Sequence, residues 1–65
     1  MSDTIDVWMD GRERIRLRMD EVIAGRDALA AADNHDGDAV RLLRYYLNVT
    51  MWRALAIIKA ARLNP

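Results

Sequence analysis

Hydrophobic residues in the second half of the chain recur at helical spacing. From Asp38 to Leu63 no proline or glycine interrupts the sequence, and apolar side chains return every three or four positions. The segment Asn64-Pro65 is typical of a helix end, because proline cannot continue a helix. We therefore predict a long helix over residues 38–63.

The first half also carries a helical pattern. Asp10 followed three residues later by Glu13 resembles a capping box, the arrangement that often begins a helix. Good helix formers fill most positions from Glu13 to Ala32 without a proline. This pattern predicts a second helix over residues 11–32, preceded by a lead segment over residues 1–9 that could add a strand.

A rival interpretation exists for residues 4–19, because apolar and polar residues also alternate there with the period of a strand. Asp10-Gly11 is a typical hairpin turn, and a three-residue loop would pair the flanking segments. The pairs would be Val7 with Ile15, Ile5 with Leu17, Asp6 with Arg16 and Trp8 with Arg14. The helix is favoured, since Arg, Leu and Met prefer helices and an isolated hairpin is marginally stable. The hairpin stays open as the alternative.

The polar segment 33–37 is the clear break between the two predicted helices. Asn34 is suited to the left-handed conformation that ends helices, and Asp36 or Asp38 can cap the next one. Two helices joined by so short a loop fold back antiparallel. The expected fold is an all-α, antiparallel two-helix hairpin over residues 10–65, in which Gly25 makes room for Tyr45 or Tyr46.

The long helix carries more apolar surface than one neighbouring helix can cover. Besides the face that meets the first helix, it has a second apolar face. This second face consists of Leu42, Tyr45, Val49, Trp52 and Ala56. A monomer rarely exposes such a patch, and a chain of 65 residues buries a small core alone. We therefore predict a protein-binding surface there, completing a four-helix bundle by homodimerisation or by docking on a larger protein.

Charge is distributed unevenly although the formal net charge is zero. All ten Asp and Glu residues lie between Asp3 and Asp38, and every charged residue within 39–65 is Arg or Lys. A polar stripe on the long helix contains Arg41, Arg44, Lys59 and Arg62. The stripe could pair with acids of the first half or contact phosphates, which makes a nucleic-acid-binding regulator the alternative function. Pairing is favoured, because a neutral protein lacks strong attraction to phosphate.

Candidate chemistry is sparse. The chain has no cysteine and a single histidine, His35, so thiolate and zinc sites lack ligands. The acidic turn fails as a calcium loop, because Ala32 and Leu43 stand where carboxylates are required. We expect no enzyme activity, no metal and no cofactor. The longest uncharged run has eight residues, from Tyr45 to Trp52, so we expect a soluble, cytoplasmic protein without a membrane partner.

The predicted layout resembles that of small dimeric plasmid copy-number regulators, which have a similar length and two helices joined by one short turn. The resemblance concerns layout alone and transfers no functional residue. The expected function is a non-enzymatic protein–protein interaction module that acts as a regulator or inhibitor, or as a subunit of a larger assembly. Small cofactor-free proteins of this kind include phage- and plasmid-encoded modulators, so we expect a bacterial protein encoded by a phage or plasmid.

Overall fold

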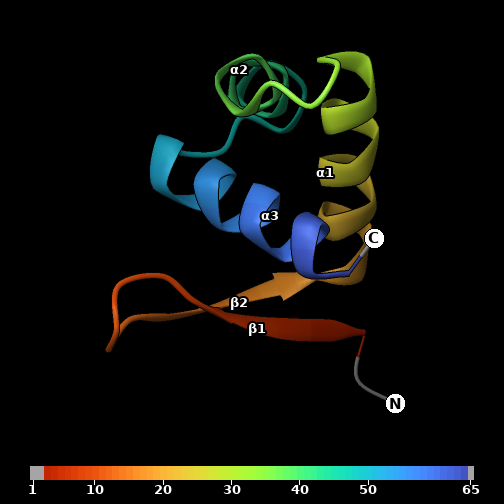
Figure 1. Ribbon diagram of the computed structural model, residues 1–65. Coiled ribbons are helices and arrows are strands. Elements are labelled where there is room, and N and C mark those ends of the chain that lie inside the picture. The colour runs from red at the N-terminus through yellow and green to blue at the C-terminus, as the bar shows by residue number, and fades with distance from the viewer. Residues whose placement is uncertain (1–2, 65) are drawn as a thin grey trace.

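The structure, a computed structural model, describes residues 3–64. A two-stranded antiparallel sheet precedes three helices (Figure 1). The elements are β1 (Thr4–Trp8), β2 (Arg14–Arg18), α1 (Met19–Ala31), α2 (Asp36–Leu47) and α3 (Met51–Leu63). The predicted all-α helical hairpin is therefore wrong, and the fold is α+β. Residues 1–2 of the predicted lead segment, and the Pro65 predicted to end the last helix, lie outside the described residues.

The alternative interpretation of residues 4–19 has the correct structure and the correct register. Strands β1 and β2 pair Ile5 with Leu17 and Val7 with Ile15. At the turn, the Met9 N–H donates to the Glu13 carbonyl oxygen at 2.9 Å, and Gly11 adopts φ +65°. Glycine suits this left-handed conformation because it has no Cβ. Residue 11 thus lies in a hairpin turn, and the helix predicted to begin there is wrong.

Alternation of the side chains explains why the hairpin forms. Val7 and Leu17 are buried on its inner face. On the outer face the Asp6 carboxylate lies 3.2 Å from Arg16 Nε and 3.7 Å from Arg14 Nε. One face is thus apolar and the other carries opposite charges across the strands, which is the pattern that stabilises antiparallel pairs.

Helix α1 follows β2 directly and begins at Met19. The capping carboxylate belongs to Glu21, whose Oε1 accepts a hydrogen bond from the Arg18 N–H at 2.9 Å. At the other end the chain turns through Asp33 and Asn34, both with positive φ. The Asn34 N–H donates to the Leu29 carbonyl oxygen at 2.8 Å, which satisfies an end of α1. The turn predicted over residues 33–37 overlaps this link, although α2 already begins at Asp36.

The long helix predicted over residues 38–63 is divided into α2 and α3. Asn48 ends α2 in the left-handed conformation with φ 56°. Thr50 then caps α3, because its Oγ1 accepts a hydrogen bond from the Arg53 N–H at 3.1 Å. The division changes the direction of the chain, so α2 and α3 contact each other as separate helices (Figure 1).

Helix α3 supplies the centre of the core. Leu17, Val22 and Ile57 are the largest fully buried side chains, one each from β2, α1 and α3. Gly25 of α1 faces α3, where an added Cβ would lie 2.7 Å from Ile57 Cγ2. The expected contact of Gly25 with a tyrosine is therefore wrong, and its small size instead permits close packing of α1 on α3.

The hairpin covers one side of α3. Lys59 Nζ donates to the Trp8 carbonyl oxygen, and Arg53 Nη2 donates to the Arg16 carbonyl oxygen at 3.3 Å. Ala56 lies between these two cations on the helix surface and is fully buried. The hairpin of the same chain thus covers apolar surface that we had expected a partner to cover.

Candidate protein-binding surface

The described part of the chain contains one buried charged side chain, and its role is structural. Glu21 is only 3% exposed. Its Oε1 and Oε2 accept hydrogen bonds from Arg53 Nη2 at 2.7 Å and Arg53 Nε at 2.8 Å. The same Oε1 also accepts the Arg18 N–H. Both oxygens are therefore engaged, and this carboxylate is no free acid or base.

Electrostatics of this pair follow from its contacts. Hydrogen bonds from Arg53 lower the pKa of Glu21 below its ordinary value of 4.5, against the opposing effect of burial. The same hydrogen bonds raise the pKa of Arg53. Both groups therefore stay charged at neutral pH, and they fasten the start of α1 to α3.

Two adjacent tyrosines on α2 are unusually exposed. Tyr45 and Tyr46 each have 76% of their surface open to solvent. Their rings meet edge to face, with centroids 5.0 Å apart and planes at 86°. Tyrosine side chains are rich in apolar area and are enriched in protein interfaces. Their exposure on one helix therefore indicates a contact surface.

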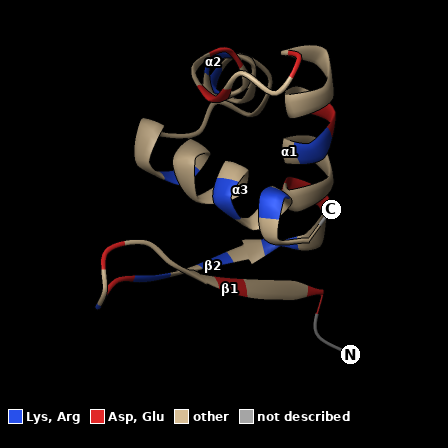
Figure 2. Ribbon diagram, viewed as in Figure 1, with Lys and Arg blue, Asp and Glu red and all other residues tan. Residues whose placement is uncertain are grey.

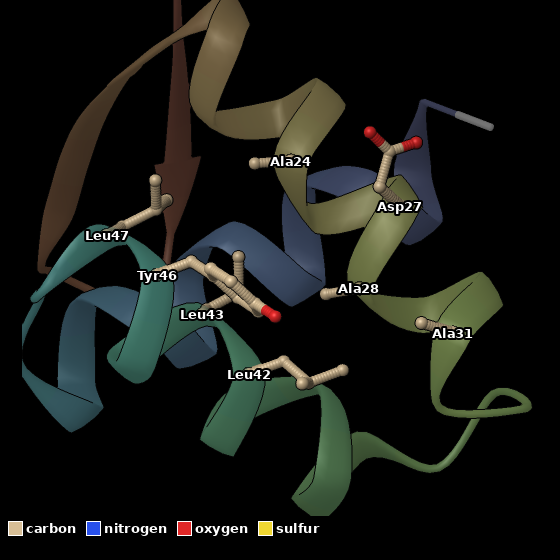
Figure 3. Close-up of a pocket in the computed structure, with 8 residues that line it drawn as sticks. All are labelled: Ala24, Asp27, Ala28, Ala31, Leu42, Leu43, Tyr46 and Leu47. Atoms are coloured by element: carbon tan, nitrogen blue, oxygen red, sulfur yellow. The ribbon is translucent and has the colours of Figure 1, made fainter.

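An open apolar groove of about 310 Å³ lies beside Tyr46, between α1 and α2 (Figure 3). Alanines of α1 form one side, and larger side chains of α2 form the other. The lining residues are Ala24, Asp27, Ala28, Ala31, Leu42, Leu43, Tyr46 and Leu47. Together with Tyr45, these residues are called the tyrosine face.

A second open hollow, of about 540 Å³, adjoins the groove and shares Ala31 and Leu42 with it. It reaches the α1–α2 turn, and Asp33, Asp38 and Arg41 stand at its edge. The tyrosine face is thus an apolar strip with charges of both signs along one end. Such an arrangement, an apolar centre with a polar rim, is that of a protein interface.

The structure brings together only part of the predicted protein-binding set. Leu42 and Tyr45 lie on the tyrosine face. Val49 lies half-buried in the link between α2 and α3, and Ala56 is buried in the core. Trp52 is 43% exposed, and its Nε1 donates to Glu13 Oε1 at 2.9 Å. These last three residues are therefore separated from the tyrosine face.

The cations predicted for the alternative, nucleic-acid surface have different surroundings. Arg41 and Arg44 line a hollow between α2 and α3. Figure 2 marks the Lys and Arg positions of these helices in blue. Lys59 is held by the hairpin backbone. Arg62 pairs with the Asp36 carboxylate, and its Nη2 donates to the Asn34 carbonyl oxygen at 3.0 Å. Two of the four cations thus hold the fold together.

Sequence reasoning missed part of this surface. Tyr46, Leu47 and Asp27 are absent from the predicted protein-binding set. The available signal was Asn48, a residue suited to ending a helix, because a break there frees the last turn of α2 from the core. Two consecutive tyrosines before such a break are typical of a surface, since both hydroxyl groups need polar partners.

Among residues 3–64, the histidine His35 is exposed at the start of α2. Over this range no cluster of three or more His, Asp or Glu is arranged to hold a metal ion. None of the helices here has the length and apolar character needed to cross a membrane. No known protein family, curated protein or solved structure matches the chain.

Proposed function

We propose that this chain is a non-enzymatic protein-binding module, acting as a regulator or inhibitor or as a subunit of an assembly. Its contact surface is the tyrosine face. The observation that carries the proposal is the exposure of Tyr45 and Tyr46 beside an apolar groove. Aromatic anchors next to a hydrophobic pocket dominate the binding energy of many interfaces.

The shape and composition of the groove also favour binding over catalysis. Asp27 is its one carboxylate, and the other residues that line it are alanine, leucine and tyrosine. General acid–base or nucleophilic catalysis needs a reactive group with a second group to activate it. An open apolar groove instead suits the side chains of another protein.

The nucleic-acid alternative has less support. Lys59 and Arg62 are engaged in contacts within the chain, which leaves Arg41 and Arg44 of the predicted stripe to meet a phosphate. Phosphate binding depends on several cations acting together. Two arginines on a protein of zero net charge supply little of that attraction.

Photocrosslinking in the cells that produce the protein tests the proposal. A benzoylphenylalanine replaces Tyr46, and a matched control carries it at Arg16, whose side chain is 68% exposed on the hairpin. We expect irradiation to produce protein adducts from position 46 and few from position 16. Equal adduct yields at both positions, or none at position 46, would contradict the proposal.

A further inference from the structure

We infer that the tyrosine face binds a second copy of this chain, with the two α2 helices packed antiparallel around a two-fold axis. This inference rests on the proposed function and names the partner of the same surface. It is carried by three features of α2: the order of its charges, the position of its exposed tyrosine and the hollow beside its first turn.

The charges on the exposed side of α2 are self-complementary. Asp38 stands in the first turn and Arg41 one turn later, and both border the hollow next to Ala31. A two-fold axis between Arg41 and Leu42 of two antiparallel helices places residue 38 of one copy opposite residue 45 of the other, and residue 41 opposite residue 42. Arg41 of one copy then stands one turn, about 6 Å along the axis, from Asp38 of the other. The long arginine side chain spans this gap, and the pairing occurs twice.

The same alignment matches shape. Rotation about that two-fold axis places Tyr45 of one copy over Asp38 of the other. Asp38 borders the open hollow, where Ala31 and Ala32 leave space for a ring. The Asp33 and Asp38 carboxylates at its edge can accept a hydrogen bond from the tyrosine hydroxyl. Each copy thus offers a ring and a recess that receives it.

Buried area sets the expected strength. Since a tyrosine buries about 150–250 Å² when covered, four tyrosines that are each 76% exposed supply roughly 450–750 Å². Leu42 and Leu47 of both copies, which are at most about a third exposed, bring the total to roughly 700–1,000 Å², which reaches the lower limit for a specific interface only at its upper end. We therefore expect a dimer that dissociates in the micromolar range.

Charge reversal tests the arrangement. At about 100 µM, where a micromolar dimer is nearly saturated, sedimentation velocity should show the wild-type chain at twice its mass of 7.5 kDa. Asp38→Arg and Arg41→Asp should each weaken dimerisation by about tenfold or more, because each places like charges within reach of one another. An equimolar mixture of the two variants should dimerise again, since both contacts are then of opposite charge.

Arg44→Asp is the matched control. It makes the same change of charge on the same helix, but Arg44, unlike Arg41, does not line the hollow beside Ala31. Arg44→Asp should therefore leave dimerisation unchanged. Circular dichroism confirms that every variant is folded. A monomeric wild type, single variants that dimerise like the wild type, or a mixture that stays monomeric would overturn the inference. In the crosslinking experiment, adducts only with other proteins would also overturn it while leaving protein binding supported, whereas no adduct would contradict both.

Discussion

Glu21 is a charged residue whose burial depends on Arg53. Replacing Glu21 with glutamine removes the charge and points amide hydrogens toward the Arg53 donors. We expect Glu21→Gln to lower the free energy of unfolding by about 2–3 kcal/mol, because a buried pair loses one partner. Chemical denaturation measures this change. Asp20→Asn is the control, since Asp20 is exposed next to Glu21, and equal stability of the two variants would contradict the role assigned to the pair.

The same residue should make stability depend on pH. The folded-state pKa of Glu21 is lowered from 4.5, so its contribution is complete above that value and is lost as the pH falls through the folded-state pKa. Between about pH 7 and pH 3 the wild type should therefore lose more stability than Glu21→Gln. Denaturation at several pH values measures both slopes, and parallel slopes would refute this prediction.

Gly25 of α1 packs directly against α3, which leaves little room for a side chain. An alanine Cβ would meet Ile57 Cγ2 at 2.7 Å and the Ile57 carbonyl oxygen at 3.1 Å. Alanine improves helix propensity by about 1 kcal/mol, but overpacking costs about 1–3 kcal/mol. We expect Gly25→Ala to be destabilising by up to about 2 kcal/mol in thermal or chemical unfolding, the overpacking cost less the gain in helix propensity. Gly37→Ala, where no atom lies near the added Cβ, is the control and should not be destabilising.

At the scale of elements, the sequence indicated the hairpin as one possible structure. It did not favour the hairpin over a helix. The alternation that pairs Val7 with Ile15 gave the correct register. Local propensity favoured a helix, because arginine, leucine and methionine make up all but one of the residues of β2 and the residue after it. The decisive contacts are tertiary: Arg53 and Lys59 of α3 bind backbone carbonyl oxygens of the hairpin. Since these contacts join residues far apart in the sequence, a local sequence pattern carries no information about them.

The division between α2 and α3 did have a local signal. Asn48 ends one helix and Thr50 caps the next, both in their preferred roles. We expect Thr50→Ala to reduce the free energy of unfolding by about 1 kcal/mol, because the Arg53 N–H loses its acceptor. Thr50→Ser retains the acceptor oxygen and should restore most of the stability. If the serine variant unfolds as readily as alanine, the cap is not the cause.

For the whole molecule, the candidate surface was only partly predictable. Helical spacing correctly grouped Leu42 with Tyr45, because both lie in one helix. It failed beyond Asn48, since the chain changes direction there and spacing no longer relates α2 to α3. Ala56 was assigned to a partner because the sequence pattern could not show that the hairpin of the same chain covers it. Correct prediction of the surface residues therefore requires knowing where each helix ends.

Trp52 connects two distant parts of the molecule, the start of α3 and the hairpin turn. Its Nε1 donates to Glu13 Oε1 at 2.9 Å. We expect Trp52→Phe to destabilise the fold by about 1 kcal/mol through loss of this hydrogen bond. Dimerisation should stay unchanged, because Trp52 lies outside the tyrosine face. Denaturation at several protein concentrations separates the two effects, and a loss of concentration dependence would place Trp52 in the interface instead.

The central position of α3 also has a consequence for biosynthesis. Glu21 cannot form its ion pair until Arg53, which is 32 residues later in the chain, has been synthesised. Ribosomes add about 5–20 residues per second, so the delay is roughly 2–6 s. During this time the hairpin and α1 lack the helix that covers their apolar surfaces. Nascent chains of this protein therefore expose those surfaces to chaperones and proteases until α3 leaves the ribosome.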